Sequence, residues 1–202
     1  MEPLGVVLAG GAGRRMGGSK ALASLAGRPL IAYPVQAMRA AVGEVVVVAK
    51  LSTRLPALEG ARIVREAQPA HHPLVGIREA LRVAGDRPVL VCPADLPFVD
   101  AALLRTLAYA DAGEAPAVVA ANGGDVQPLL GCYRADVLDA LPSSGSMREA
   151  VAAIGARLLD VPELALFNVN TPEDLAHAEA LIAHASPDKR RGTSADWQEP
   201  HV

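Results

Sequence analysis

Short apolar runs rich in β-branched residues recur along the chain, and segments with helical spacing lie between several of them. Runs that are apolar throughout are typical of strands in a sheet buried on both faces. The predicted strands are Gly5–Ala9, Glu44–Ala49, Arg62–Val64, Pro88–Cys92, Ala117–Ala121, Leu129–Tyr133 and Arg157–Asp160. The predicted helices are Pro29–Ala41, Val75–Val83, Ala101–Tyr109, Ser146–Ile154 and Pro172–Ala185. This alternation predicts the α/β class, as a three-layer α/β/α Rossmann-like fold with a mostly parallel central sheet.

Length and charge narrow the class of protein further. The chain has 202 residues, which suits a single domain, predicted over residues 1–185. Residues 186–202 are polar, charged and without periodicity, so we expect a disordered tail. The net charge of -3 gives no reason to expect a nucleic-acid partner. The two cysteines argue against a disulfide framework. No signal peptide or long apolar run is present, so we expect a cytoplasmic protein without a membrane partner.

Glycines and cations gather just after the first predicted strand. Gly10, Gly11 and Gly13 let the backbone approach a ligand closely, because no side chain stands in the way. Arg15 and Lys20 bring positive charge to the same turn. Backbone N–H groups and cations at a strand-to-helix turn form an anion site. The sequence therefore predicts that this turn binds a nucleotide polyphosphate.

Two familiar phosphate loops do not match this turn. A Walker A loop, G-x-x-x-x-G-K-[ST], needs lysine before serine, whereas here Ser19 precedes Lys20. A dinucleotide fingerprint, G-x-G-x-x-G, needs a third glycine where Met16 stands. The run from Leu8 to Lys20 instead resembles the L-A-G-G-x-x-x-R-M-G-x-[DS]-K loop of nucleotidyltransferases that make nucleotide-linked cofactors and sugars.

That resemblance assigns roles to the residues of the loop. In the family the loop wraps the triphosphate of the nucleotide, and its lysine steadies phosphate charge during transfer. The resemblance therefore implies that Arg15 and Lys20 stabilise the triphosphate. The nucleotide contacts that it implies in this region are Leu8, Ala9, Gly10, Gly11, Gly13 and Lys20.

An aspartate between two prolines follows the predicted strand Pro88–Cys92. Asp95 lies on a rigid turn at the edge of the sheet where ligands bind. Nucleotidyl transfer needs a divalent cation, and a carboxylate is its usual hard ligand. The alternative is that Asp95 caps the helix at Ala101–Tyr109, but Asp100 is better placed for that cap. The turn also resembles the metal-binding aspartate motif of the same family, which implies Mg²⁺ at Asp95, with Mn²⁺ as the alternative.

The nucleobase side departs from the family at three positions. Glu66 and Gly76 stand in a segment that resembles the family's acidic residue and following G-P-L-x-G turn, which lie beside the base and sugar. Glu66 replaces the frequent aspartate, and His72 replaces the first glycine of the turn. Guanylyltransferases often carry an asparagine near Lys50, where this chain has no amide, so base contacts there would come from backbone groups.

The acceptor side is predicted from residues late in the chain. Asn168 and Asn170 alternate with apolar residues, so their amides share one face of an extended segment and suit a polar heterocycle. The alternative is that the two asparagines only cap the next helix, but Thr171 alone is sufficient for that cap. The run N-V-N-T-P-E-D-L closely resembles the C-terminal motif of molybdenum cofactor guanylyltransferases. The resemblance further implies that Gln127, in a turn before a strand, faces the acceptor and that Arg148 faces the pterin phosphate.

Together these motifs span Gly5 to about Ile182 in the order of the family. The resemblance implies transfer of GMP from GTP to molybdopterin, giving molybdopterin guanine dinucleotide and pyrophosphate. It leaves open further partners that deliver molybdopterin or mature molybdoenzymes. A cytidylyltransferase of the same fold would usually read L-A-A-G and D-Q-P, and Gly10 and Leu96 favour guanine instead. A sugar-phosphate or phospholactate nucleotidyltransferase stays open as well, and so does a non-catalytic nucleotide-binding regulator.

Overall fold

The architecture is known from a computed structural model, which describes residues 1–10, 20–66, 73–141 and 145–185. The predicted tail at 186–202 lies outside these residues. Within them, no helix is long and apolar enough to cross a bilayer.

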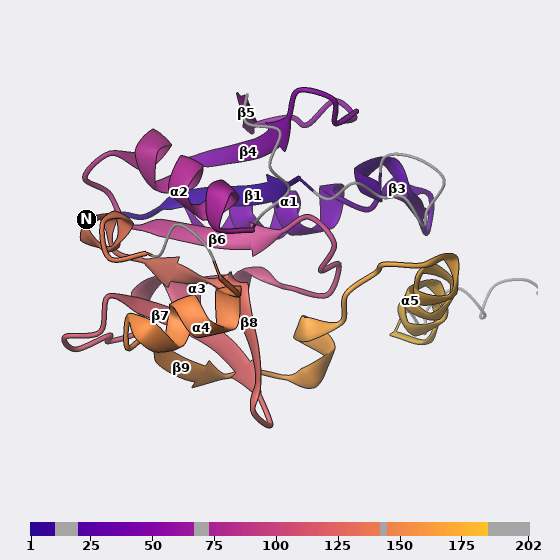
Figure 1. Cartoon of the computed structure of the whole chain (residues 1–202). Helices are drawn as coiled ribbons and strands as arrows, with labels where there is room; N and C mark the ends of the chain where they lie inside the picture. The colour runs from indigo at the N-terminus through magenta and orange to yellow at the C-terminus, as the bar shows by residue number, and fades with distance from the viewer. Residues whose placement is uncertain (11–19, 67–72, 142–144, 186–202) are drawn as a thin grey trace, which may run out of the picture.

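A seven-stranded sheet of the order β5-β4-β1-β6-β8-β7-β9 forms the centre of the described chain (Figure 1). Strand β8 is antiparallel to both its neighbours, and the other pairings are parallel. The predicted mostly parallel α/β sheet is therefore confirmed. The strands are β1 (Leu4–Ala9), β4 (Val45–Lys50), β5 (Arg62–Glu66), β6 (Val89–Pro93), β7 (Ala117–Asn122), β8 (Asp125–Tyr133) and β9 (Arg157–Asp160).

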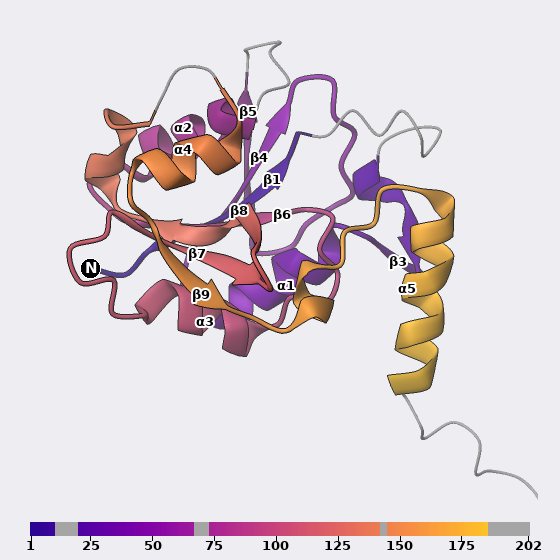
Figure 2. The same cartoon turned by 60° about the horizontal axis from the view of Figure 1, so that its bottom comes forward.

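Four helices cover the two faces of this sheet, as Figure 2 shows. Helices α1 (Ala32–Ala41) and α3 (Ala101–Tyr109) lie on one face, and α2 (Pro73–Ala84) and α4 (Met147–Ala153) lie on the other. The predicted three layers are thus present. Two of these four helices begin with a side-chain cap: Asp100 accepts from Leu103 N–H, and Ser146 forms a capping box with Glu149.

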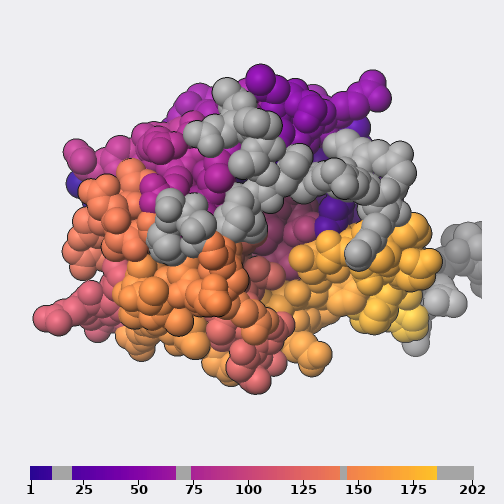
Figure 3. All heavy atoms as spheres, in the orientation of Figure 1, coloured from indigo at the N-terminus to yellow at the C-terminus, as the bar shows by residue number. Residues whose placement is uncertain are grey.

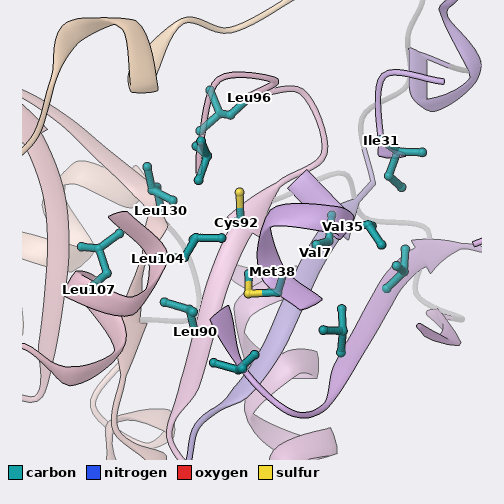
Figure 4. Packing of buried hydrophobic residues seen from close by; sticks show 14 of the residues in the cluster. Val7, Ile31, Val35, Met38, Leu90, Cys92, Leu96, Leu104, Leu107 and Leu130 are labelled. Carbon is teal, nitrogen blue, oxygen red and sulfur yellow. The ribbon is translucent and has the colours of Figure 1, made fainter. Parts of the chain in front are cut away.

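Apolar side chains fill the space between the layers. Between the sheet and the helices α1 and α3, Met38 and Leu104 pack against Val7 and Leu90, all fully buried (Figure 4). Each such side chain contributes about 1.5–3 kcal/mol by leaving water. Gly5 lets α1 lie close to β1, because a Cβ there would lie 2.7 Å from Met38 Cγ.

The last helix lies apart from these layers. Helix α5 (Pro172–Ala185) packs on a small hairpin of β2 (Ser24–Leu25) and β3 (Arg28–Pro29), with Leu25 and Ala178 buried between them. Figures 1 and 2 both place α5 beside β3 and away from the central sheet. The hairpin was missed, and the predicted helix start at Pro29 is wrong. The chain turns through positive φ at Ala26 and Gly27, which pairs Pro29 with Ser24 and delays the helix to Ala32.

The strand predicted at Leu129–Tyr133 begins earlier, at Asp125. Gln127 therefore lies in β8 and not in a turn before it, which corrects that part of the prediction. The pairing of β7 with β8 shifts between Val119 and Ala120, so that Gly131 and Gln127 face consecutive residues. This bulge accommodates Pro128, which has no N–H to donate to a neighbouring strand. Short 3-10 segments, at Lys20–Leu22 (η2), Ala135–Leu138 (η3) and Glu163–Leu166 (η4), complete the chain.

Candidate active site

A cavity of about 300 Å³ opens at the carboxyl ends of β1, β4, β5 and β6. The chain passes from β1 to β4 on one side of the sheet and later returns to β6 on the other, so β1 marks a switch in strand order. Ligands of open α/β sheets bind beyond the strand ends at such a point. In the space-filling view, the surface is hollowed between the first part of the chain and the C-terminal helix (Figure 3).

Two opposite charges lie at one end of the cavity. Lys50 ends β4 and Glu66 ends β5, and the two residues are register partners in the sheet. Lys50 Nζ donates to Glu66 Oε1 at 2.8 Å, with only 9% and 5% of the two side chains exposed. Arg65 fixes the turn that follows β4, because its Nη1 donates to the carbonyl oxygens of Lys50 and Thr53. This end of the cavity therefore presents a buried acceptor beside a buried donor.

Lys20, at the start of η2, is the cation at the other end. Its Nζ donates to Asp95 Oδ2 at 2.5 Å, to Asn170 Oδ1 at 2.6 Å and to Asn168 Oδ1 at 3.3 Å. Only 12% of the lysine side chain and 22% of the aspartate side chain are exposed. Residues separated by about 150 positions in sequence thus meet around one ammonium group.

Hydrogen bonds of the backbone hold the asparagine segment beside Asp95. Val169 N–H donates to Asp95 O at 3.0 Å, and the Val169 side chain is fully buried. At the start of α5, Asp174 accepts from the N–H groups of Asn170 and Thr171, while Thr171 Oγ1 accepts from Asp174 N–H. These bonds, with that from Asn170 the largest influence, hold the pKa of Asp174 below its ordinary value. Thr171 is therefore the helix cap, as predicted.

The carboxylate of Asp95 is suited to coordinate a hard cation. Its Oδ1 atom is buried without a hydrogen-bond partner among the described residues, while Oδ2 accepts from Lys20. A divalent cation coordinated through Oδ1 would satisfy that oxygen. No cluster of three His, Cys, Asp or Glu side chains occurs in the part of the chain that the structure describes. Mg²⁺ is usually held by one or two carboxylates together with substrate phosphates and water, and Asp95 can supply one such carboxylate.

Most of the predicted site residues that the structure describes lie together. Nine of them line the cavity: Leu8, Ala9, Gly10, Lys20, Glu66, Gly76, Asp95, Gln127 and Asn168. Gly10 leaves room in it, because a Cβ at this position would contact nothing within 4 Å. Asn170 reaches the site through Lys20. The predictions at Gly11, Gly13 and Arg15 lie outside the described residues.

Arg148 lies apart from the cavity lining. It stands on α4 and forms an ion pair with Asp125, at the start of β8, with both side chains more than half exposed. Its predicted contact with an acceptor phosphate therefore stays a prediction.

Lys50 is the functional candidate that sequence reasoning missed. Backbone groups were expected to make the base contacts at this strand end, whereas the Lys50 side chain itself lines the cavity. The signal was a lysine that follows four valines and an alanine at the end of a buried strand. Lysine is almost never fully buried unless it is paired, so one that ends such a strand is a candidate for the ligand-binding edge.

Neither cysteine has the properties of a nucleophile. Both are free thiols, and burial is the main cause that raises their pKa values, to about 11 for Cys132 and further for Cys92. A protonated thiol is a poor nucleophile, so covalent chemistry at these residues is disfavoured.

Comparisons with known proteins identify relatives over about 90% of the chain. Residues 5–163 match the family described as the MobA-like NTP transferase domain. A molybdenum cofactor guanylyltransferase from Cereibacter sphaeroides is 36% identical over 192 residues, covering 90% of this chain and 98% of the relative. The solved structure of molybdopterin-guanine dinucleotide biosynthesis protein A from Archaeoglobus fulgidus is 26% identical with a TM-score of 0.66, covering 90% and 99%. A manganese complex of Rv0371c from Mycobacterium tuberculosis shares the fold, with 19% identity and a TM-score of 0.67 over 89% and 98% of the two chains.

Proposed function

The chain belongs to the MobA-like NTP transferase family, and on that premise we propose that it transfers GMP from GTP to molybdopterin with release of pyrophosphate. The observation that carries the proposal is the cavity itself, with a buried donor–acceptor pair at one end and Lys20 with Asp95 at the other. A nucleoside triphosphate likewise has two different ends, with a base at one and phosphates at the other.

The base is assigned to the end with Lys50 and Glu66. Guanine presents two neighbouring donors, N1–H and the 2-amino group, beside the acceptor O6. A carboxylate with two oxygens accepts from both donors, and an ammonium donates to O6. Cytosine offers a single amino group at the corresponding edge and so satisfies the pair less fully. This complementarity supports GTP as the nucleotide.

The triphosphate is assigned to the end with Gly10 and Lys20. The open space at Gly10 lets phosphate oxygens approach the backbone, and Lys20 supplies a cation beside them. Leu8, Ala9 and Gly76 would line the path between base and phosphate, with Gly11, Gly13 and Arg15 completing the loop.

Asp95 would hold Mg²⁺, or Mn²⁺ in its place, because its Oδ1 atom lies buried without a hydrogen-bond partner among the residues that the structure describes. A bound divalent cation would offset the charge that develops on the departing pyrophosphate. A terminal phosphate oxygen of the acceptor attacks the α-phosphorus in line as the bond to the β-phosphate oxygen breaks. Positioning and charge neutralisation by Lys20 carry the reaction, and no covalent intermediate with the protein is needed.

The acceptor is assigned to the side of the cavity formed by Gln127 and Asn168. Their amides suit the donors and acceptors of a pterin. Asn170 and Arg148 would also contact the acceptor, with Arg148 at its phosphate.

Two measurements test this assignment. Calorimetric titration with GTP, CTP and ATP in the presence of Mg²⁺ should give the tightest binding for GTP, and tighter CTP binding would move the protein to the cytosine branch. Pyrophosphate release should then depend on added molybdopterin. A protein that binds GTP but releases no pyrophosphate with molybdopterin would be a nucleotide-binding regulator, and release with a sugar phosphate instead would identify a different acceptor.

A further inference from the structure

We propose that Asn168 and Asn170 are positioning residues for Lys20, and that they hold its ammonium group in place when Asp95 turns to a metal ion. This inference rests on the proposed function and deepens it. The Oδ1 atoms of the two amides serve the catalytic lysine, which leaves the amide Nδ2 groups for the acceptor.

The contacts around Lys20 match the chemistry of an ammonium group. An ammonium has three N–H donors and no acceptor. Three oxygens receive them, at 2.5 Å from Asp95, 2.6 Å from Asn170 and 3.3 Å from Asn168. A lysine side chain loses about 2 kcal/mol of rotamer entropy when it is fixed. Several partners are therefore needed to keep it in one place.

The two amides are held more firmly than a flexible loop would allow. Val169, which lies between them, is fully buried and donates its N–H to Asp95 O. Asp174 fixes the backbone N–H of Asn170 from the other side. Because alternate residues of an extended segment point to the same side, both amides face Lys20. The backbone thus sets the position of the lysine.

The neutrality of the amides matters once a metal ion approaches Asp95. A divalent cation on Oδ1 of this carboxylate repels the Lys20 ammonium, which is bonded to Oδ2 of the same group. Amide oxygens still accept from Lys20 and add no negative charge that would bind the metal themselves. Lys20 would then keep two of its three bonds and turn the third N–H toward a phosphate oxygen. Carboxylates at positions 168 and 170 would instead add competing ligands for the metal.

The lysine content of the chain makes a direct test simple. Only three lysines occur: Lys20, Lys50 and Lys189. Acylation of the full-length protein by acetic anhydride, followed by mass spectrometry of peptides, reports how well Lys20 is held, with the buried Lys50 as the internal reference. Asn170→Ala should raise the acylation rate of Lys20 by about tenfold relative to Lys50, as loss of a charge-assisted hydrogen bond allows. Asn122→Ala, at the end of β7, is the matched control, because that amide donates to Val161 O and not to Lys20.

Kinetics distinguish positioning from acceptor binding. Asn170→Ala should lower kcat by about tenfold and leave the KM for GTP unchanged, whereas the lost Nδ2 contact should raise the KM for molybdopterin alone. Asn170→Asp keeps an oxygen acceptor and should leave Lys20 as protected as in the wild type. Unchanged Lys20 acylation together with a raised molybdopterin KM in Asn170→Ala would overturn the proposal. The acylation result does not depend on turnover, so a wild-type protein without transferase activity would refute the proposed function alone.

Discussion

Lys50 and Glu66 form an ion pair that is almost completely withdrawn from water, 2.8 Å apart at the ligand-binding edge of the sheet. They are the two charged side chains classed as buried among the described residues. Taking both charges out of water costs several kcal/mol for each ion, which their mutual attraction barely repays. The pair is therefore poorly explained by stability, and its place in the cavity points to ligand recognition.

Replacing both members of this pair separates stability from binding. Lys50→Met combined with Glu66→Leu should leave the free energy of unfolding unchanged or raise it by about 1–4 kcal/mol, as for other buried pairs replaced by apolar residues. GTP affinity should fall by about tenfold or more, because the base then meets no charged partner. Thermal melting and calorimetry on the same samples measure both. Glu44→Gln, which alters an exposed pair with Arg87, is the control and should change neither quantity. Unaltered GTP binding in the double variant would show that the base does not bind at this end of the cavity.

Lys20→Met should lower kcat by about tenfold to a thousandfold, as loss of a charge partner for the transition state commonly does. The same variant should bind Mn²⁺ more tightly than the wild type without nucleotide, because the ammonium no longer repels a cation at Asp95. Electron paramagnetic resonance of free Mn²⁺ measures this affinity. A variant with full activity would exclude Lys20 from the chemistry.

The free energy of unfolding of Lys20→Met has to be measured as well, because Lys20 is not an exposed lysine. The sequence suggests a solvent-exposed loop residue, whereas 88% of the side chain is buried, since 12% is exposed. Lys20→Arg keeps the charge and is the matched control for the melting temperature. If Lys20→Met and Lys20→Arg unfold alike, the loss of activity reports charge and not misfolding.

Asp95→Asn retains the size of the side chain and removes its charge. It should abolish metal-dependent transfer and reduce Mn²⁺ binding below detection, because an amide is a much weaker ligand for a hard cation. The backbone bond from Val169 to Asp95 O is independent of the side chain, so the fold should persist. Circular dichroism checks the fold. Normal transfer at saturating Mg²⁺ would mean that the metal is held elsewhere.

Arg148→Ala tests the acceptor side. The ion pair with Asp125 is exposed and worth about 0.2–1 kcal/mol at most, so the melting temperature should hardly move. If Arg148 faces the acceptor phosphate, the molybdopterin KM should rise by about tenfold while the GTP KM is unchanged. Asp125→Ala breaks the same ion pair and keeps the arginine, so it should lack this effect. Equal kinetics for the two variants would leave Arg148 with a purely structural role.

Asp174 gives the protein a defined pH dependence. Its pKa in the folded protein is lowered from 3.8, first by the bond from Asn170 N–H. Because the pKa of Asp174 is lower in the folded protein, its carboxylate stabilises the fold fully at pH values above its ordinary pKa of 3.8. This stabilisation is lost as the pH falls through the lower pKa of the folded protein. Asp174→Ala should therefore lower the melting temperature at pH 7 by about 2–4 °C, and the difference should shrink below that window. Glu173→Ala in the same helical turn is the control. A difference that stays constant into strong acid would contradict the assignment.

The sheet and its helices could be predicted because local patterns determine them. The valines of β4 and the spacing in α3 indicate their structures directly. The β2–β3 hairpin could not be predicted, because it depends on positive φ at Ala26, a residue that rarely adopts it. The early start of β8 depends on a bulge that forms only against β7. The site shows the same division. Asp95 could be identified from its turn, whereas the pairing of Lys50 with Glu66 requires strands that lie side by side.

The meeting of Lys20 with Asn168 and Asn170 also sets the time at which the protein becomes competent during synthesis. Strands β1, β4, β5 and β6 all precede residue 94, so a growing chain can pair them early, since folding proceeds from the N-terminus as the chain emerges. The two asparagine partners of Lys20 are made only after β9, and helix α5, which packs on the hairpin after Lys20, is made later still. A chain released after β9 but before residue 168 thus has the strands of the sheet but lacks both amides that hold its lysine. Competence for transfer therefore arrives only after the whole sheet has been made.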